Sequence, residues 1–363
     1  MRLPGKILDK YIIKKFIGTY LVSLILIIGI VIIFDISEKI DKFVEKEAPL
    51  RAIVFDYYAN FIPYILNTFS PIFVFITVIF ITSKLAGNSE IIAMLSGGMS
   101  FGRLMRPYMI SALLIAIFTF ILGLYIIPPA NKERLDFEQQ YVKGTNYYNS
   151  SKNIHYQLSP GNFVYVESFS SWNNTAYKFT LEDIENNRIT KKLTAEVAAW
   201  DTTFNGWELK NCVIREYIGA SEKVSFKKQI DTVISLTLDD FYRRRNVVES
   251  LPQKDLDELI AMQKMRGDDM VKYALIEKNS RLAMPFSAFI LTIIGVALSS
   301  KKRRGGIGLN IGIGIALSFT YILFMKFSEM FVHTGALPPE IALWMPNILF
   351  AIVAAVLYRM APK

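Results

Sequence analysis

The sequence has very little of the two residue types that most often build metal and nucleophilic sites. Its 363 residues include one cysteine, Cys212, and two histidines, His155 and His333. One cysteine cannot form an internal disulfide, and no Cys/His cluster is present that could hold zinc. We therefore expect no metal, no cofactor and no active site built on these residues. The cysteine content gives no indication of the redox compartment.

The sequence also lacks the G-x-x-x-x-G-K-[ST] motif that binds nucleotide phosphates. Its glycine-rich stretch, RRGGIGLNIGIGIAL, has no lysine after the glycines. We expect these glycines to allow close packing of membrane helices instead; they are Gly306, Gly308, Gly312 and Gly314. The chain is therefore not expected to be an enzyme or to hydrolyse ATP itself. Its sequence pI near 9.3 is explained by membrane anchors, so we expect no nucleic-acid binding.

Charge is absent from six long stretches, in a chain that is 52% hydrophobic with a mean hydropathy of +0.31. A membrane-spanning helix needs about 20 apolar residues. The six uncharged runs have 18 to 27 residues: Phe16–Phe34, Tyr57–Ser83, Pro107–Asn131, Leu282–Ser300, Gly305–Met325 and Ile341–Tyr358. The first is too long for a signal-peptide core and no small-residue cleavage site follows it, so we expect it to remain as an anchor. These runs predict an α-helical membrane protein with six transmembrane helices.

The net charge of +9 is unevenly distributed along the chain. Four segments carry +4, +2, +4 and +2, respectively: Met1–Lys15, Lys84–Arg106, Lys301–Arg304 and the tail from Arg359 to Lys363. All four lie on the same side of a six-span chain, and the positive-inside rule places that side in the cytoplasm. Both termini are therefore expected there, and residues 132–280 on the opposite side. The basic segments are interpreted as topology anchors, although Lys301–Arg304 could also contact a cytoplasmic partner or anionic lipid headgroups.

About 150 residues of ordinary globular composition separate the third and fourth runs. Six segments rich in aromatic and β-branched residues, separated by Gly, Asn and Pro turn signals, predict an inserted all-β domain, either a sandwich or an open barrel. The segments are Asn153–Leu158, Asn162–Phe169, Tyr177–Glu185, Lys192–Thr202, Gly206–Ile218 and Gln229–Leu238. After Pro252 the pattern becomes that of an amphipathic helix. The predicted domains are 1–132 with a short cytoplasmic helix at 88–97, 133–252 (the β-domain), and 253–363 with a connecting helix and the last three spans.

The short helix lies in the loop GNSEIIAMLSGGMS. Asn88 can cap its start, and Glu90 in the first turn favours the helix dipole. Gly97-Gly98 predicts a left-handed stop, and Ser100 a cap for the next helix. Ile91, Ile92, Met94 and Leu95 form an apolar ridge. Such a helix either couples the spans to a cytoplasmic motor or rests on lipid, and its chemistry alone favours neither.

Lys326 follows 21 uncharged residues in the fifth run. Ionisable groups at membrane depth usually face a cavity or a partner. Glu329 lies three residues further on, where it could simply pair with Lys326. Both interpretations stay open.

Several segments together resemble the lipopolysaccharide-export permeases of the LptF/LptG type. The resemblance rests on the three-plus-three span order around a β-domain, the head LDKYIIKKF, the loop SEIIAMLSGGMS and the ending GALPPEIALWMPNILFAIVAAVLYR. It covers nearly the whole chain. The head, the loop and the length are closer to the G type than to the F type.

The resemblance implies a bacterial inner-membrane permease subunit that extracts lipopolysaccharide and passes it to a periplasmic bridge. Its β-domain would be jellyroll-like. The implied partners are a dimer of cytoplasmic ATPases (LptB-like), a second six-span permease (LptF/LptG-like), jellyroll bridge proteins (LptC/LptA-like) and lipopolysaccharide. The family's coupling glutamate falls on Glu90, so the resemblance favours motor coupling through Glu90, Ile91, Met94 and Leu95. The alternative function is a membrane-anchored scaffold that binds periplasmic proteins without transport.

The family's cavity is lined by basic residues of the first span, and Lys39 falls on one such position. A second basic position is occupied here by Ile33, and Lys42, one turn after Lys39, is a substitute. Lys39, Lys42 and Lys326 are therefore the candidates for contact with the lipid headgroup. The other interpretation of Lys39 and Lys42 is a solvated helix end beside three acidic residues, Glu38, Asp41 and Glu45.

Overall fold

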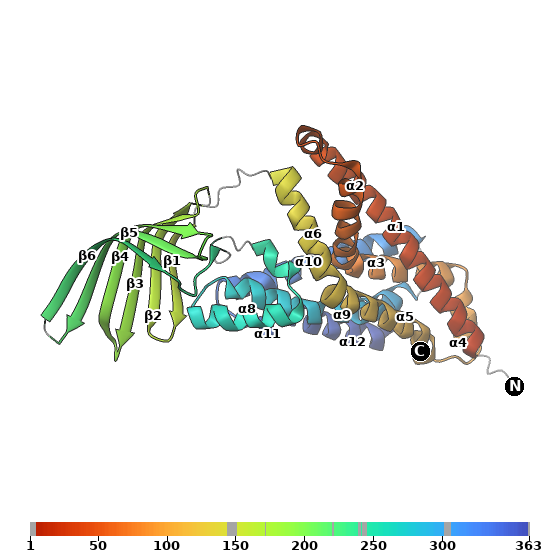
Figure 1. The fold of residues 1–363 in the computed structure, drawn as a ribbon. Coiled ribbons are helices and arrows are strands. Elements are labelled where there is room, and N and C mark those ends of the chain that lie inside the picture. The colour runs from red at the N-terminus through yellow and green to blue at the C-terminus, as the bar shows by residue number, and fades with distance from the viewer. Residues whose placement is uncertain are drawn as a thin grey trace. The chain divides into compact units, whose positions relative to one another are not determined.

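The computed structural model describes residues 5–143, 151–170, 172–219, 221–238, 241, 245–300 and 306–361. The chain separates into a helical unit and a second unit that contains a sheet (Figure 1). The helical unit consists of Met1–Val142, Glu249–Gln253 and Leu275–Lys363, and the sheet unit of Lys143–Val248 and Lys254–Ala274. The basic cluster Lys301–Arg304 lies outside the described residues.

Six stretches of the described chain are helical, long and apolar enough to cross a membrane, as predicted. The helices of the first half are α1 (Gly5–Glu45), α2 (Leu50–Ala52), α3 (Ala59–Gly87), α4 (Glu90–Ser96), α5 (Phe101–Ile121) and α6 (Ile127–Phe137), with π-helical segments η1 (Ile53–Tyr58), η2 (Leu122–Ile126) and η3 (Glu138–Lys143). Those of the second half are α8 (Gln253–Arg266), α9 (Val271–Ser299), α10 (Gly306–His333), α11 (Pro339–Ala342) and α12 (Met345–Met360), preceded by the 3-10 segment η4 (Arg245–Ser250). With a rise of 1.5 Å per residue, α1 is roughly 60 Å long, about twice the hydrocarbon thickness.

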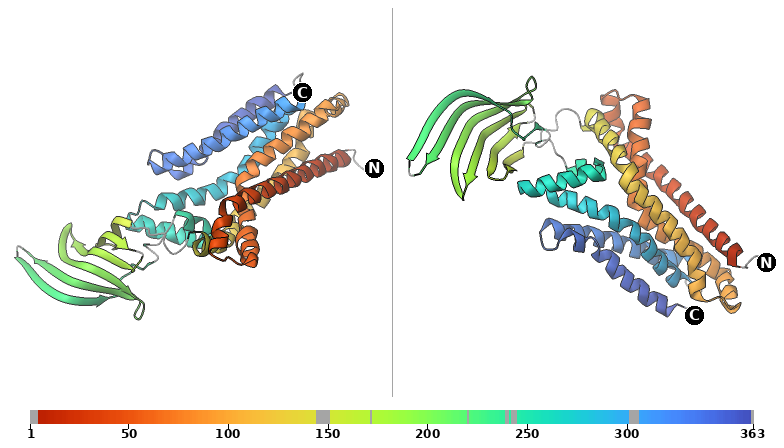
Figure 2. Two further views of the ribbon diagram at one scale, coloured as in Figure 1. Left: turned by 90° about the horizontal axis from the view of Figure 1, so that it is seen from above. Right: turned by 60° about the horizontal axis from the view of Figure 1, so that its bottom comes forward.

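Helix α3 is the centre of the helical unit, and Figure 2 shows it between α1 and the C-terminal helices. The Ser70 hydroxyl hydrogen-bonds to Tyr20 of α1 at 2.7 Å. The Thr82 hydroxyl donates to Tyr108 of α5 at 3.1 Å. The Asn310 amide of α10 donates to Ser83 at 3.0 Å. Neighbouring helices thus satisfy polar groups that lipid could not.

The second unit contains a six-stranded antiparallel sheet whose strands lie in chain order. The strands are β1 (Ser151–Ser159), β2 (Asn162–Ser170), β3 (Thr175–Glu185), β4 (Arg188–Asp201), β5 (Gly206–Ile218) and β6 (Ser221–Thr232). The inserted all-β domain is therefore confirmed. Among the described residues its strands form one sheet in meander order, so the two packed sheets of a sandwich are not seen there.

One face of the sheet forms the core of this unit. Val166, Phe179 and Trp207 are buried on it. The segment after β6 packs against the same cluster through Leu236 and Phe241, and the Trp207 indole donates a hydrogen bond to the Leu236 carbonyl at 2.7 Å. The apolar face of the sheet is thus closed by the chain itself.

The last strand is where the sequence-based expectation was wrong. We expected it at Gln229–Leu238, but β6 ends at Thr232, and the apolar residues beyond it leave the sheet to cover the core. The real strand is exposed and polar, with Lys223, Lys227 and Lys228. Charged residues are suited to an edge strand because they discourage pairing with another chain. An edge strand has no need of the aromatic and β-branched residues on which the expectation rested.

Two boundaries also differ from the expected domains. The third span continues as helix to Val142, past the expected end at residue 132. Helix α8, expected to lie with the last three spans, belongs to the sheet unit. The Arg266 side chain on α8 donates to the Ser235 carbonyl at 2.9 Å and stacks on Tyr156 of β1. These contacts involve residues distant in sequence, so local pattern does not indicate them.

Close helix packing occurs at one glycine of the expected cluster, Gly314, and at Gly295 outside it. A side chain added at Gly308 or Gly312 would meet nothing within 4 Å, whereas a Cβ atom at Gly314 would overlap Ile79 Cδ1 of α3. The tightest approach to a neighbouring helix over several atoms is at Gly295 of α9. There a Cβ atom would lie 2.7 Å from Val78 Cγ1 and 3.3 Å from the Phe75 ring of α3.

Replacing Gly295 with leucine should therefore force α9 and α3 apart. We expect Gly295→Leu to destabilise the protein by about 1–3 kcal/mol, the usual cost of overpacking. The matched control Gly312→Leu should stay within about 0.5 kcal/mol, because its position is open. Thermal unfolding of the purified proteins in detergent measures both. Equal stability of the two variants would contradict this account of the packing.

Candidate functional site

The short helix α4 has a left-handed residue directly before it and another shortly after it, and its first turn has no side-chain cap. Ser89 precedes it in the left-handed conformation, with φ of 63°. At its end the Gly98 N–H donates to the Leu95 carbonyl at 3.0 Å, and the Met99 N–H to the Met94 carbonyl at 3.2 Å. Gly98 has φ of +86°, which glycine adopts without strain. This is the expected left-handed stop, with the bond pattern of a Schellman motif.

The other caps follow the expectations in part. The Ser100 hydroxyl accepts the Arg103 N–H at 3.3 Å and caps α5, as predicted. The expected cap by Asn88 is not formed, because Ser89 occupies the position before α4 and its side chain makes no capping hydrogen bond. Asn88 instead donates from its amide to Glu90 Oε1 at 3.2 Å.

Helix α4 uses most of its apolar ridge to dock on the helical unit. Ile91 is completely buried, and Met94 and Leu95 are half-buried against the same core cluster. Ile92 is 49% exposed, and Glu90 is half-buried at the rim. The surface open to a partner is therefore Glu90 with Ile92. Ile91, expected to contact a motor, anchors the helix instead.

Glu90 is connected to the first helix. The Tyr11 hydroxyl of α1 donates to Glu90 Oε2 at 3.2 Å. Lys15, one turn along α1, donates to the same tyrosine oxygen and lies over its ring. The carboxylate is thus held between α1 and the start of α4, with its outer side accessible.

A second link joins α1 to α5 at the same end of the unit. The Arg103 guanidinium makes two parallel bonds of 2.7 Å to the two carboxylate oxygens of Asp9. Phe101 lies 5.5 Å from the Tyr358 ring of α12. The beginning of α1, the end of α12 and helix α4 therefore lie together, as a chain with an even number of spans requires (Figure 1).

Lys39 lies in a polar network at the opposite end of α1. Its ammonium pairs with Asp35 at 2.6 Å, and the two side chains are only 17% and 12% exposed. Tyr57 and Tyr58 also donate to the Asp35 carboxylate, at 3.2 and 3.1 Å. The charge of Lys39 is therefore neutralised within the chain. The network fastens the C-terminal part of α1 to the π-helical segment η1.

Aromatic rings extend this network along α3. Phe61 is stacked on Tyr57, with ring centroids 5.7 Å apart. The Lys39 ammonium lies 5.8 Å from the Phe61 ring centroid, and the Arg134 guanidinium of α6 lies 5.6 Å from it. Arg134 also pairs with Glu138 at 3.3 Å. Cation–π contacts and paired charges thus connect α1, α3 and α6.

The other two candidate lysines are accessible. Lys42 is exposed, and no ion pair or hydrogen bond of its side chain is found among the described residues. Lys326 is 68% exposed while its ammonium binds both carboxylate oxygens of Glu329, at 2.7 and 2.9 Å. The possible pairing with Glu329 is therefore present, and it leaves most of the Lys326 side chain uncovered.

A half-buried carboxyl group, that of Glu249, occurs where the chain re-enters the helical unit after the sheet. Burial raises the pKa of Glu249 to about 7, and nearby Glu277 adds to this, whereas Arg134, Lys326 and Arg281 act in the opposite direction. Arg281 is paired with Glu277 at 2.7 Å and donates to the Leu251 carbonyl at 3.0 Å. These bonds seat the returning segment on α9.

The described residues contain no group of three or more His, Cys, Asp or Glu side chains placed to hold a metal ion. The candidate residues therefore consist of the Glu90 carboxylate on α4 and of three lysines, which are Lys39, Lys42 and Lys326. The family model described as lipopolysaccharide export system permease LptF/LptG matches residues 10–360. The chain belongs to this family.

The chain is similar to LptG proteins of Escherichia coli and Haemophilus influenzae. The lipopolysaccharide export system permease protein LptG of Escherichia coli (strain K12) is 20% identical over 360 residues, which cover 97% of both chains. The LptG protein of Haemophilus influenzae is 23% identical over 359 residues, covering 95% of this chain and 96% of the relative. LptF/LptG family membership, six spans and the inserted sheet together indicate a multi-pass inner-membrane permease.

Sequence reasoning missed the partners of the candidate residues. Asp35, Tyr57 and Tyr11 were not considered, although each makes a contact that determines what a candidate can do. Asp35 had a local signal, because an acid directly after an uncharged run needs a partner at membrane depth. Nothing local to Tyr11 indicated contact with a residue 79 positions later.

Glu249 generates a prediction about stability and pH. The folded protein keeps its proton up to about pH 7, whereas the unfolded chain loses it near the usual value of 4.5. The folded state therefore binds more protons between these values, and its stability falls as the pH rises through them. We expect Glu249→Gln to lose this dependence and to be about 1–3 kcal/mol more stable than wild type at pH 8.

Thermal unfolding in detergent at pH 5 and pH 8 measures this effect. Glu45→Gln, which changes an exposed carboxyl group at the end of α1, serves as the control and should keep the wild-type profile. An unchanged pH profile in Glu249→Gln would show that this carboxyl group is not the titrating group.

Proposed function

We propose that the chain is the permease subunit of an ATP-driven transporter that extracts lipopolysaccharide from the inner membrane and passes it to a periplasmic bridge. The observation that carries the proposal is α4, a short helix that ends in a Schellman motif. It is docked through Ile91 and presents Glu90 and Ile92 outward. A membrane-anchored scaffold has no need of such a surface.

The partner at α4 is proposed to be a dimer of cytoplasmic ATPases (LptB-like). An exposed apolar side chain beside a carboxylate suits a groove with a basic residue, because charge pairing gives specificity and apolar burial gives affinity. Force from the motor would pass from α4 to α1 through Glu90 and Tyr11. The excess of basic residues at this end supports a cytoplasmic location for both termini.

A second six-span permease is the proposed partner within the membrane. The most apolar windows of α1 and α10 are only 17% and 28% buried within this chain, against 61% for α9. These two spans are therefore the least covered by their own unit. Two permeases meeting along them would enclose a space open to the lipid's acyl chains, each of which holds to the bilayer by about 0.8 kcal/mol per CH₂ group.

The lysines near the outer end of the spans are proposed to meet the acidic parts of the lipid headgroup. Lys42 and Lys326 present exposed ammonium groups for this contact. Lys39 would have to exchange Asp35 for the lipid, so we propose that it acts in positioning α1. The sheet unit is proposed to meet the periplasmic bridge proteins (LptC/LptA-like).

Replacing Glu90 tests the proposed coupling. Glu90→Ala should leave the protein folded and inserted, because α4 is anchored by Ile91, Met94 and Leu95. Removing one member of a charged contact with the motor should lower ATP-driven lipid release by roughly tenfold or more, corresponding to at least 1.4 kcal/mol. Release of lipopolysaccharide from vesicles that contain the complete transporter measures it.

Glu45→Ala provides the matched control, since it removes an exposed carboxylate from the far end of α1. It should release lipid at the wild-type rate. Wild-type release by Glu90→Ala would refute coupling through Glu90. Normal assembly without any ATP-dependent release in the wild type would favour the scaffold.

Lys326 tests the contact with the headgroup. A cavity supplies water and an anionic partner to an ammonium that would otherwise be costly at membrane depth. We expect Lys326→Gln to weaken photocrosslinking to lipopolysaccharide and Lys326→Arg largely to preserve it, since a charge-assisted bond contributes about 1.5–3 kcal/mol. Normal crosslinking of the Gln variant, with stability restored by exchanging Lys326 and Glu329, would show that the pair is structural.

A further inference from the structure

The sheet has a second face, on the side opposite the core cluster. Side chains alternate along a strand, so the neighbours in sequence of the core residues Tyr156 and Val164 point to the opposite side. His155 pairs with Tyr165, and Gln157 pairs with Phe163, across β1 and β2. The first of these rows continues to Thr180 of β3, and the second to Glu182 and then Lys192 of β4. Directly paired residues share a face, so seven side chains from four strands form one surface.

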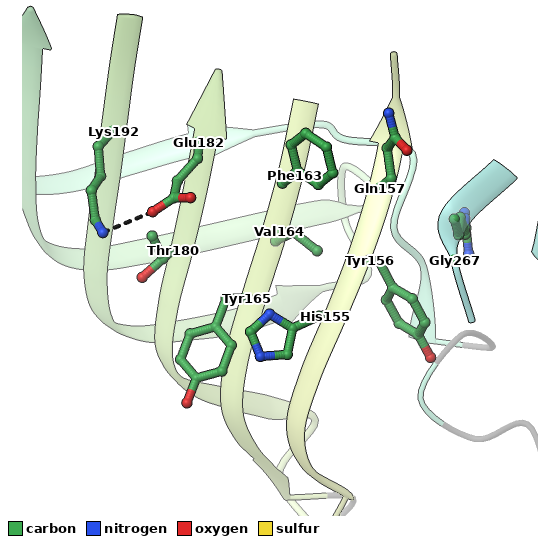
Figure 3. A pocket seen from close by; sticks show the side chains of 11 residues that line it. His155, Tyr156, Gln157, Phe163, Val164, Tyr165, Thr180, Glu182, Lys192 and Gly267 are labelled. Atoms are coloured by element: carbon green, nitrogen blue, oxygen red, sulfur yellow. Dashed lines mark ion pairs between the residues drawn. The ribbon is translucent and has the colours of Figure 1, made fainter. Parts of the chain in front are cut away.

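This surface is hollowed into a pocket of about 500 Å³ (Figure 3). Sites for small ligands usually measure about 300–1,000 Å³. Tyr156 and Gly267 lie at its edge beside β1, and the Arg266 guanidinium closes over the Tyr156 ring at 5.6 Å. The whole pocket belongs to the sheet unit, which includes Arg266 at the end of α8 and the following Gly267.

The two halves of the pocket floor differ in chemistry. The half on β1 and β2 is aromatic, with His155 and Tyr165 rings 4.6 Å apart and Phe163 half-buried beside them. The half on β3 and β4 is polar, with Glu182 and Lys192 joined at 2.7 Å. That ion pair is a quarter to a third exposed, so its unused donors and acceptors can reach a ligand.

We propose that this pocket binds a sugar unit of the lipopolysaccharide's oligosaccharide; this inference rests on the proposed function. A sugar ring has apolar C–H faces that lie on aromatic rings and hydroxyl groups that exchange hydrogen bonds with carboxylate, ammonium and amide groups. The pocket offers these two kinds of surface side by side. Within the pocket floor Glu182 neutralises the charge of Lys192. The Arg266 guanidinium lies over the Tyr156 ring at the edge, so the floor itself does not select a phosphate.

The binding test uses the full-length permease in detergent, without an ATPase. The probe is the oligosaccharide obtained by deacylating lipopolysaccharide, and saturation-transfer NMR reports which sugar protons contact the protein. We expect transfer to ring protons in the wild type. Removing one aromatic face by Phe163→Ala or Tyr165→Ala should weaken binding roughly three- to tenfold. Tyr165→Phe keeps the ring and should bind like the wild type.

The chain provides a matched control on the same face. Phe226 of β6 pairs with Val213, which pairs with Thr194, which pairs with Thr180. It therefore lies on the open face, outside the pocket, and is 77% exposed. Phe226→Ala should bind the oligosaccharide normally. Cys212, the chain's single thiol, is buried in the core of this unit, so its resistance to thiol reagents confirms that each variant is folded.

Absence of saturation transfer to the wild type would overturn the proposal. The proposal would also be overturned if Phe226→Ala weakened oligosaccharide binding as much as the pocket variants do. A third contradicting result would be a bridge protein that binds this face and is lost in the pocket variants, while the oligosaccharide does not bind. The outcome is separable from the proposed function, because lipid release depends on Glu90. If the wild type binds the oligosaccharide and Glu90→Ala releases lipid normally, the proposal for the pocket stands and the coupling through Glu90 is refuted.

Discussion

The helical unit depends on the rule that polar groups within a membrane must find partners inside the protein. Helix α3 meets this rule with three neighbours, through Tyr20, Tyr108 and Asn310. Asn347 does the same for the C-terminal helices, since it accepts from the Tyr321 hydroxyl and donates to the Ala283 carbonyl. Each such bond is worth about 0.6 kcal/mol, and its main effect is to fix which helix faces are adjacent.

That arrangement determines what the two ends of the unit can do. Because α3 holds both α1 and α5, the loop between α3 and α5 is short and α4 is held against α1. A carboxylate on α4 is thereby placed within reach of Tyr11. At the far end α1 and η1 bring Asp35 and Tyr57 together, and Asp35 neutralises the charge of Lys39. Helix α1 therefore connects the Glu90 carboxylate on α4 with the network around Asp35 near its own C-terminal end.

The sheet unit treats its two faces differently. The segment after β6 closes one face, and the Trp207 bond to the Leu236 carbonyl fastens it there. The other face keeps aromatic and charged side chains in two cross-strand rows. A sheet with one closed apolar face and one open mixed face can bind a polar, sugar-like ligand without exposing its core.

The sequence by itself determined the elements whose cause is local. Uncharged runs require six spans, Gly97-Gly98 ends α4, Ser100 caps α5, and turn residues delimit five of the six strands closely. These features follow from solvation and backbone preferences within a few residues. The tertiary structure decided the rest: that Ile91 anchors α4 while Glu90 meets Tyr11, that Lys39 is neutralised by Asp35, that Glu249 is half-buried near Glu277, and that the residues after Thr232 cover the core. Each of these features depends on which side chain from a distant segment occupies the neighbouring space. Such contacts between segments far apart in sequence leave no periodic pattern in the sequence, so local reasoning cannot predict them.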